Sequence, residues 1–237
     1  MADKSEIIVG PKIIVGPKNV AGASECHTNA STSARKLLEI ALVFALILAA
    51  LWTPQGRLNS FFCITAAVCV LGVAFAGRWG PREMGLTQPM AGAVKILLAG
   101  LALCGVIGAT GFALRSLGPG YPIPLSRSWQ YAIWALVQEF ILLSMFFIRL
   151  ESVLGSRRAV FWAASLYAVA HLPSPLLTML SFLGGLLFCE LFSRWRNLFP
   201  LGIVHAALGL TISTSLPDKW LHHMRVGIGY LSSQHWQ

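Results

Sequence analysis

Seven apolar segments follow one another along this chain, and they restrict its fold more than any other feature of the sequence. A helix that crosses a membrane needs about 20 mainly apolar residues, or slightly fewer where the bilayer thins. The segments approach that length and lie at about 36–52, 60–76, 91–114, 129–148, 159–172, 176–192 and 199–216. We therefore expect an all-α protein, a polytopic transmembrane bundle of about seven to eight helices.

Few residues are available to cover a water-exposed surface. Charged residues make up 11% of the chain, against about 25% in a soluble domain, and 56% of the residues are hydrophobic. This composition excludes an ordinary cytosolic enzyme and a disordered protein. The net charge of +9 includes no run of more than two Lys or Arg residues, so we expect no nucleic-acid partner. The five cysteines show no CxxC spacing, which argues against a disulfide framework or a zinc knuckle.

The two ends of the chain differ from its apolar middle. Residues 1–34 are polar, contain a direct repeat of Ile-Ile-Val-Gly-Pro-Lys, and are expected to form a flexible cytoplasmic tail. Two copies are too few for a repeat fold, which needs about three. Residues 35–216 are expected to form the membrane-embedded core. Residues 217–237 are expected to form a C-terminal tail or an interfacial segment, or to add an eighth short helix.

The basic residues predict the orientation of the bundle. If all seven segments cross, 13 of the 18 Lys and Arg residues lie on the side of the N-terminus and five lie on the other. Loops on the cytoplasmic side of a membrane protein carry the excess of Lys and Arg. The N-terminus is therefore expected to be cytoplasmic.

Three ionisable residues lie inside the apolar segments, where a charge costs at least about 2.5–3.5 kcal/mol at the centre of a helix. They are Glu139, His171 and His205. With a rise of about 1.5 Å per residue, they lie about 14, 18 and 10 Å from the inner ends of their segments. All three fall within a layer about 8 Å thick, on three different helices. If those helices touch, one carboxylate and two imidazoles can converge in one buried pocket.

Such a set of groups can hydrolyse a peptide bond without a nucleophilic Ser or Cys. A buried carboxylate can act as a general base for water, one His can share the water's proton, and another can donate to the forming oxyanion. Glu139, His171 and His205 could instead bind a divalent metal such as zinc, since one carboxylate and two imidazoles form a known ligand set. No HExxH motif is present, so the metal alternative depends on tertiary proximity alone. A structural role, with each His as a hydrogen-bonding strut between helices, also stays open.

The residues around these positions resemble the CPBP family of intramembrane endopeptidases, also called the ABI or CAAX-protease family. The resemblance covers about residues 130–210. The blocks that carry it are Gln138-Glu139-Phe140, Tyr167 to Pro173, Gly184-Gly185 and Arg196 to Ala206. The family's pattern is Glu-Glu-x-x-x-Arg, then Phe-x-x-x-His, then His-x-x-x-Asn/Asp, on successive membrane helices.

By that pattern the chain is a divergent member. Gln138 stands at the first Glu, Leu143 at the Arg, Tyr167 at the Phe and Gly209 at the Asn/Asp. The resemblance then implies that one oxyanion donor is missing, a loss that can cost about 10²–10³ in rate.

The resemblance also implies a role for each site residue. Glu139 and His171 would activate water, and His205 would donate to the oxyanion. Three further residues would support the site or contact the substrate: Gln138, Tyr167 and Arg149.

These observations favour an intramembrane endopeptidase, of glutamic type or metal-dependent, that cleaves a membrane-anchored protein or peptide in the bacterial plasma (inner) membrane. Expected partners are membrane lipids, that substrate and, by resemblance to divergent family members, bacterial protein-sorting machinery. We expect no cofactor, and zinc is the alternative. The competing interpretation is a non-catalytic family member that acts as a membrane scaffold or immunity factor, or a small proton-coupled transporter, since transporters also use buried Glu and His residues.

Overall fold

The protein is all-α, as predicted. A computed structural model describes residues 21–77, 79–88, 90–115 and 118–234, and this part of the chain contains helices and no strand. Inside lipid, a helix satisfies all of its backbone hydrogen bonds within one segment. The helices are α1 Ala21–Trp52, α2 Arg57–Ala76, α3 Ala93–Ala113, α4 Leu125–Glu139, the π-helix η2 Phe140–Phe147, α5 Ile148–Leu154, α6 Ser156–Val169, α7 Pro175–Trp195, α8 Leu198–Ser215, α9 Asp218–Leu221, the 3-10 helix η3 His222–Met224 and α10 Gly227–Gln234.

Each of the seven predicted segments corresponds to one long helix or helical run. Five of these are long and apolar enough to cross a membrane: α2, α3, the run 125–154, α7 and α8. The other two are α1 and α6. Helix α6 has only 14 residues, about 21 Å, which is short for a hydrocarbon core of about 30 Å.

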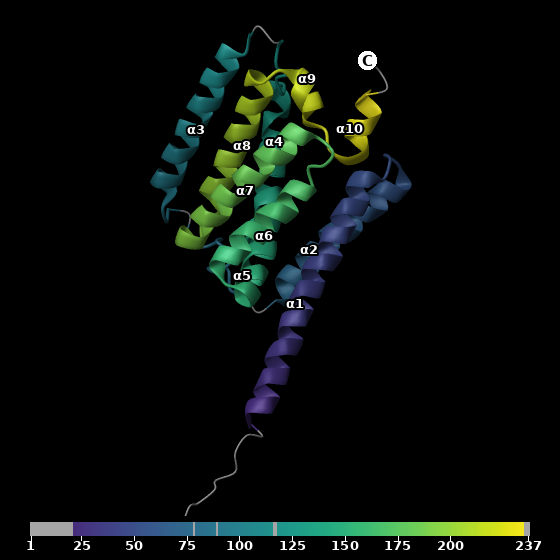
Figure 1. Cartoon of the computed structure of the whole chain (residues 1–237), viewed down its shortest axis with the longest axis vertical. Helices are drawn as coiled ribbons and strands as arrows, with labels where there is room; N and C mark the ends of the chain where they lie inside the picture. The colour runs from purple at the N-terminus through teal and green to yellow at the C-terminus, as the bar shows by residue number, and fades with distance from the viewer. Residues whose placement is uncertain (1–20, 78, 89, 116–117, 235–237) are drawn as a thin grey trace, which may run out of the picture.

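Helix α1 is longer than its apolar part. It begins at Ala21, whereas the apolar segment was expected to begin near residue 36. Residues 21–34, assigned above to the tail, are therefore helical, and the rest of that tail lies outside the described residues. The physical reason is that adding turns to an existing helix costs little, and four of these 14 residues are Ala, the best helix former. In Figure 1 this end of α1 projects well beyond the rest of the bundle.

The run 125–154 changes its helical geometry directly after Glu139. Residues 140–147 form a π-helix between α4 and α5 without a break in the chain. A π-helix is rare and frequently lies at a functional site. Every residue from 142 to 150 is buried, so this stretch is enclosed by other helices on all sides.

Small residues bring the central helices close together. Helix α8 packs against α3 and α4, and α6 packs against α7 (Figure 1). A Cβ atom at Gly202 of α8 would lie 3.4 Å from the Leu136 Cα atom of α4, and one at Gly185 of α7 would lie 3.0 Å from the Ala164 Cα atom of α6. Glycine at such positions lets backbones approach.

The chain leaves helical geometry just before Pro173. The sequence analysis placed His171 inside the helical segment 159–172. Helix α6 ends at Val169, however, so His171 lies in the turn that follows the helix. The reason is that a residue before proline disfavours the α conformation. The Leu172 carbonyl accepts a hydrogen bond from the Gly227 N–H at 2.8 Å. The C-terminal segment therefore packs against this turn, and α10 also contacts α1.

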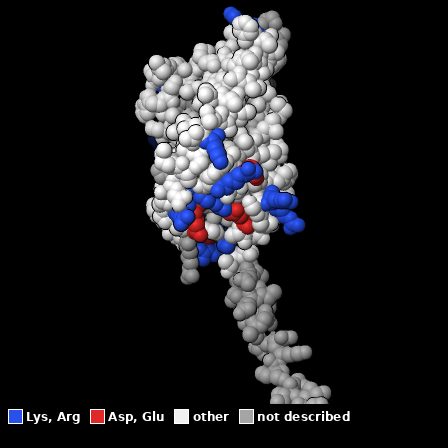
Figure 2. All heavy atoms as spheres, turned by 90° about the vertical axis from the view of Figure 1, so that its left-hand side faces the viewer, with Lys and Arg blue, Asp and Glu red and all other residues white. Residues whose placement is uncertain are grey.

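Charged side chains gather at one end of the bundle. Figure 2 shows Lys, Arg, Asp and Glu side chains together across the lower part of the body. Four ion pairs join them: Arg35–Glu39, Arg149–Glu39, Arg194–Glu190 and Arg196–Glu151. The basic residues in these pairs all belong to the set assigned above to the cytoplasmic side.

The predicted orientation can be tested with two cysteines at opposite ends of the run 125–154. Ser126 and Ser156 are both exposed, and each would be replaced by Cys in a background without native cysteines. A membrane-impermeant maleimide should label Ser126→Cys in intact cells and Ser156→Cys only in inverted vesicles. The reverse pattern would place the N-terminus outside, and labelling of both sites from one side would contradict a single crossing.

Candidate active site

A carboxylate and an imidazole meet inside the bundle, one from α4 and one from α8. Glu139 Oε1 lies 2.9 Å from His205 Nδ1. Glu139 is fully buried and the His205 side chain is 12% exposed. The second carboxylate oxygen, Oε2, is also buried and has no hydrogen-bond partner among the described residues. The pair therefore holds Glu139 by one oxygen and leaves the other able to accept a hydrogen bond.

Tyr167 of α6 joins this pair to Gln138. Its hydroxyl donates to Gln138 Oε1 at 3.1 Å and lies 3.3 Å from His205 Nε2. Helices α4, α6 and α8 thus contribute to one continuous polar chain of four side chains within an apolar bundle. The family pattern has Phe and Glu at positions 167 and 138, so the two departures contact each other.

His171 lies beside this chain. Its Nδ1 atom lies 2.7 Å from the Tyr167 carbonyl oxygen, and the centroids of the two rings are 4.6 Å apart. A carbonyl oxygen can only accept, so Nδ1 carries a proton, and Nε2 is the nitrogen that can act on another group. The Tyr167 ring also meets the His205 ring edge to face at 6.1 Å. Tyr167 is therefore the shared neighbour of the two imidazoles, while the direct partner of Glu139 is His205 and not His171.

Phe188 of α7 completes the surroundings of His205, and sequence reasoning did not identify it. Its ring stacks on the imidazole with centroids 5.6 Å apart and an interplanar angle of 23°. Phe188 is an apolar residue in an apolar segment, one turn after Gly184, so nothing in the sequence indicates that it contacts a polar site. Gly185, which was expected to allow close packing, does so, since its position also approaches Tyr167.

The side chain missing at Gly209 is replaced in space by Tyr131. A Cβ atom at Gly209 would overlap the Tyr131 hydroxyl, which reaches across from α4. Gly209 lies four residues after His205, one turn further along α8. The space left by the glycine is therefore filled by a phenol from the neighbouring helix.

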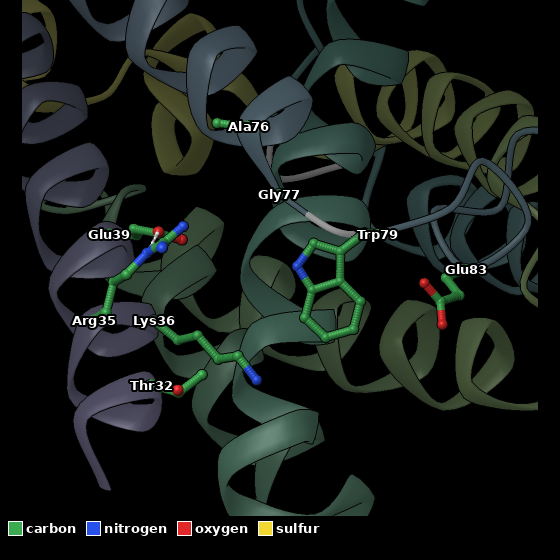
Figure 3. A pocket seen from close by; sticks show the side chains of 8 residues that line it. All are labelled: Thr32, Arg35, Lys36, Glu39, Ala76, Gly77, Trp79 and Glu83. Carbon is green, nitrogen blue, oxygen red and sulfur yellow. Dashed lines mark hydrogen bonds and ion pairs between the residues drawn. The ribbon is translucent and has the colours of Figure 1, made fainter. Parts of the chain in front are cut away.

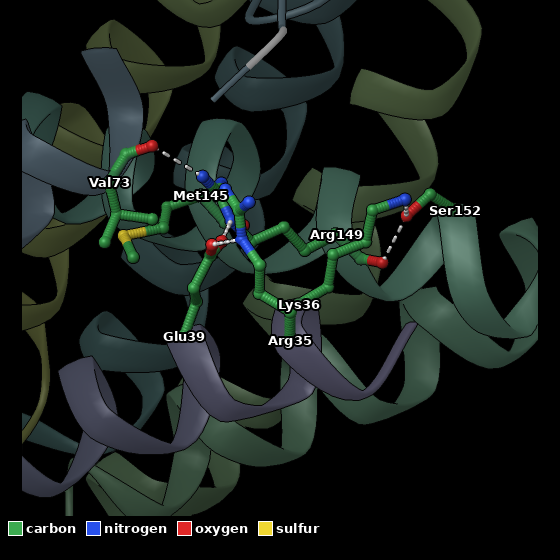
Figure 4. A network of polar contacts seen from close by, with 7 residues as sticks. All are labelled: Arg35, Lys36, Glu39, Val73, Met145, Arg149 and Ser152. Carbon is green, nitrogen blue, oxygen red and sulfur yellow. Dashed lines mark hydrogen bonds and ion pairs between the residues drawn. The ribbon is translucent and has the colours of Figure 1, made fainter. Parts of the chain in front are cut away.

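Arg149, which was predicted to support the site, lies outside the cluster around Glu139 and contacts other residues. Figure 4 shows it in a separate polar network at the charged end. Its Nε atom donates to Glu39 Oε2 at 3.1 Å, and its Nη2 atom donates to the Val73 carbonyl at 3.0 Å. The reason is separation along the helical run: Arg149 lies ten residues after Glu139, beyond the π-helix. Its contacts join α5 to α1 and α2.

A pocket of about 530 Å³ also opens at the charged end and not at Glu139. Figure 3 shows side chains of α1, the end of α2 and the following loop around it. Its lining residues are Thr32, Arg35, Lys36, Glu39, Ala76, Gly77, Trp79 and Glu83. None of them belongs to the cluster around Glu139.

The predicted zinc ligands are not arranged as a ligand set. Across the described ranges, no group of three or more His, Cys, Asp or Glu side chains is placed to hold a metal ion. Glu139 Oε1 and His205 Nδ1 are bound to each other and His171 Nδ1 is bound to a backbone carbonyl, so these three atoms are not free to bind a metal ion.

Loss of the Arg149 partner should destabilise the fold. Glu39→Gln would leave a buried guanidinium without its carboxylate, a change that costs about 3 kcal/mol when a buried pair is broken. Thermal unfolding in detergent would measure it. The control is Glu190→Gln, which breaks a surface pair worth at most about 1 kcal/mol. Equal effects of both changes would argue against the anchoring role of Arg149.

The contact of Gly209 with Tyr131 predicts a non-additive pair. Gly209→Ala should cost about 1–3 kcal/mol of stability, because the added methyl group overlaps the hydroxyl. In a Tyr131→Ala background the same change should cost little, since the obstacle is gone. Unfolding midpoints of the four proteins would measure the coupling. Equal costs in both backgrounds would contradict the contact.

Comparison with known proteins bears on the helices that carry this site. Residues 125–211 match the family model described as type II CAAX prenyl endopeptidase Rce1-like. A search of the curated proteins gave no match. The matched range agrees closely with the predicted 130–210 and contains Gln138, Glu139, Tyr167, His171 and His205. The match supports the predicted resemblance: over residues 125–211 this chain is similar to type II CAAX prenyl endopeptidases of the Rce1-like family.

Proposed function

We propose that this protein is an intramembrane endopeptidase that hydrolyses a peptide bond of a membrane-anchored protein or peptide. The family match supports a protease, and five helices able to cross a membrane support a site reached from lipid or from its surface. One observation carries the proposal: the fully buried Glu139 is held by His205 at 2.9 Å through Oε1, while its buried Oε2 has no partner among the described residues.

In the proposed reaction Glu139 is the general base. Its Oε2 atom takes a proton from water as the water oxygen adds to the carbonyl carbon of the scissile bond. The tetrahedral intermediate then breaks its carbon–nitrogen bond, and the proton passes from Glu139 to the leaving amine. The products are a carboxylic acid and an amine, and no covalent enzyme intermediate is formed.

The two histidines take different roles in this proposal from those implied by the family resemblance. His205 is engaged on both ring nitrogens, by Glu139 and by Tyr167, so it positions the carboxylate. His171 has Nε2 available, because its Nδ1 is bound to a backbone carbonyl. We assign to His171 Nε2 the contact with the attacking water or with the oxyanion.

Water must reach a carboxylate that is buried in an apolar bundle. We assign this access to the turn at residues 170–172, which contains His171 and follows the end of α6 at Val169. Irregular backbone at membrane depth is tolerated where protein or water surrounds it. A substrate that approaches from the membrane would meet the same turn. We also propose that the protein lies in the bacterial plasma membrane and that it acts together with protein-sorting machinery.

The test is cleavage of membrane-anchored substrates by the purified full chain in detergent. Glu139→Gln should lower the rate by at least about 10²–10⁴-fold, since an amide cannot take the proton. Glu190→Gln, a surface change of the same chemistry, should keep the wild-type rate. Circular dichroism and unfolding would show that both variants are folded.

Three further outcomes separate the alternatives. Loss of cleavage with a chelator and recovery with zinc would indicate that Glu139, His171 and His205 act as metal ligands. Equal cleavage by wild type and Glu139→Gln would contradict the assignment of Glu139 as the general base. No cleavage by folded wild type over a broad substrate panel would favour a non-catalytic scaffold, an immunity factor or a proton-coupled transporter.

A further inference from the structure

His205 uses both of its ring nitrogens inside the bundle, and this limits where its protons can be. Nδ1 lies 2.9 Å from Glu139 Oε1, and Nε2 lies 3.3 Å from the Tyr167 oxygen. Either contact alone could form with the proton on one side or the other, because an imidazole nitrogen can donate or accept. The tautomer is therefore decided by the next group along, which is Gln138.

Gln138 presents its carbonyl oxygen to Tyr167, and a carbonyl oxygen can only accept. The Tyr167 hydroxyl has a single proton, and it donates that proton to Gln138 Oε1 at 3.1 Å. The contact with His205 must then run the other way, with Nε2–H donating to the Tyr167 oxygen. Nδ1 and Glu139 Oε1 consequently share the one remaining proton of their hydrogen bond.

We propose that Gln138 and Tyr167 are positioning residues that fix the proton of His205 on Nε2, so that Glu139 and His205 act as one proton-sharing pair. Neither residue needs to touch the reacting atoms. Their hydrogen bonds run from α4 to α6 and from α6 to α8, so the arrangement depends on the packing of three helices. The effect of this arrangement on catalysis rests on the proposed function. The position of the proton on His205 does not depend on that function.

The surroundings keep this arrangement in place. Phe188 stacks on the His205 ring, and the Tyr167 ring meets it edge to face, so the imidazole cannot turn over without breaking both contacts. Glu139 is fully buried, and its Oε1 atom is held by His205 at 2.9 Å. A buried polar chain of this kind is favourable only when each member is satisfied, which makes every link sensitive to substitution.

The experiment is ¹⁵N NMR of the full chain labelled at histidine, with the His205 signals assigned by their loss in His205→Gln. Wild type should show a protonated Nε2. Tyr167→Phe and Gln138→Leu should each lose that fixed state, since the first removes the acceptor and the second frees the hydroxyl to donate to Nε2. Gln138→Glu should retain it, because a carboxylate oxygen still accepts from Tyr167.

Tyr121→Phe is the matched control for the tyrosine change. Tyr121 is 53% exposed, and its loss of a hydroxyl should leave the His205 signals unchanged. A bare Nε2 in wild type would overturn the proposal without the need for any variant. Retention of the wild-type signals in both Tyr167→Phe and Gln138→Leu would overturn it as well.

Where the protein cleaves a substrate, kinetics provides a second readout. Each of Tyr167→Phe and Gln138→Leu should lower kcat about tenfold with little change in KM, the size expected for one lost hydrogen bond. The double variant should be no slower than the slower single variant, because both changes act through one hydroxyl. Additive losses of kcat in the double variant would contradict the proposal that both residues act through the Tyr167 hydroxyl. A protonated Nε2 in a protein without protease activity would retain the proton arrangement and reject the proposed function instead.

Discussion

The structure depends on keeping one carboxylate inside an apolar helix bundle. A buried charge without a partner is costly in a membrane, so Glu139 needs a neighbouring helix to supply a polar group. Helix α8 does so through His205, and the two helices can approach because Gly202 has no side chain to separate them. Close packing of α4 and α8 and the chemistry of the site are thus the same feature of the protein.

Two polar networks lie at different depths and serve different ends. At the charged end, Arg149 joins α5 to α1 and α2 through Glu39 and the Val73 carbonyl. Ten residues earlier in the same helical run, Glu139 belongs to the chain of Gln138, Tyr167 and His205. The π-helix lies between them: its Met145 carbonyl accepts a hydrogen bond from Arg149 Nη1 at 3.1 Å, and its residues 142–147 are buried. The first network anchors helices, whereas the second leaves one carboxylate oxygen, Glu139 Oε2, without a partner among the described residues.

The sequence predicted the architecture well because lipid leaves a chain few choices. Apolar length alone located the long helices, and the family motifs located the helices that match residues 125–211. It placed the fifth segment's end less well, since the turn at His171 depends on Pro173 and on the Gly227 N–H that binds the Leu172 carbonyl. It also missed the helical residues 21–34, because a polar composition hides a helix that continues from an apolar one.

For the site, the sequence by itself identified the ionisable residues that lie in apolar segments, and it predicted their depths because the helical rise converts position into distance. Only the tertiary structure decided the pairing: Glu139 with His205 and not His171, Arg149 with Glu39, and Tyr131 against Gly209. The physical reason is that hydrogen bonds between helices depend on how each helix is rotated about its axis. That rotation is set by side-chain packing over the whole bundle, which no single motif contains.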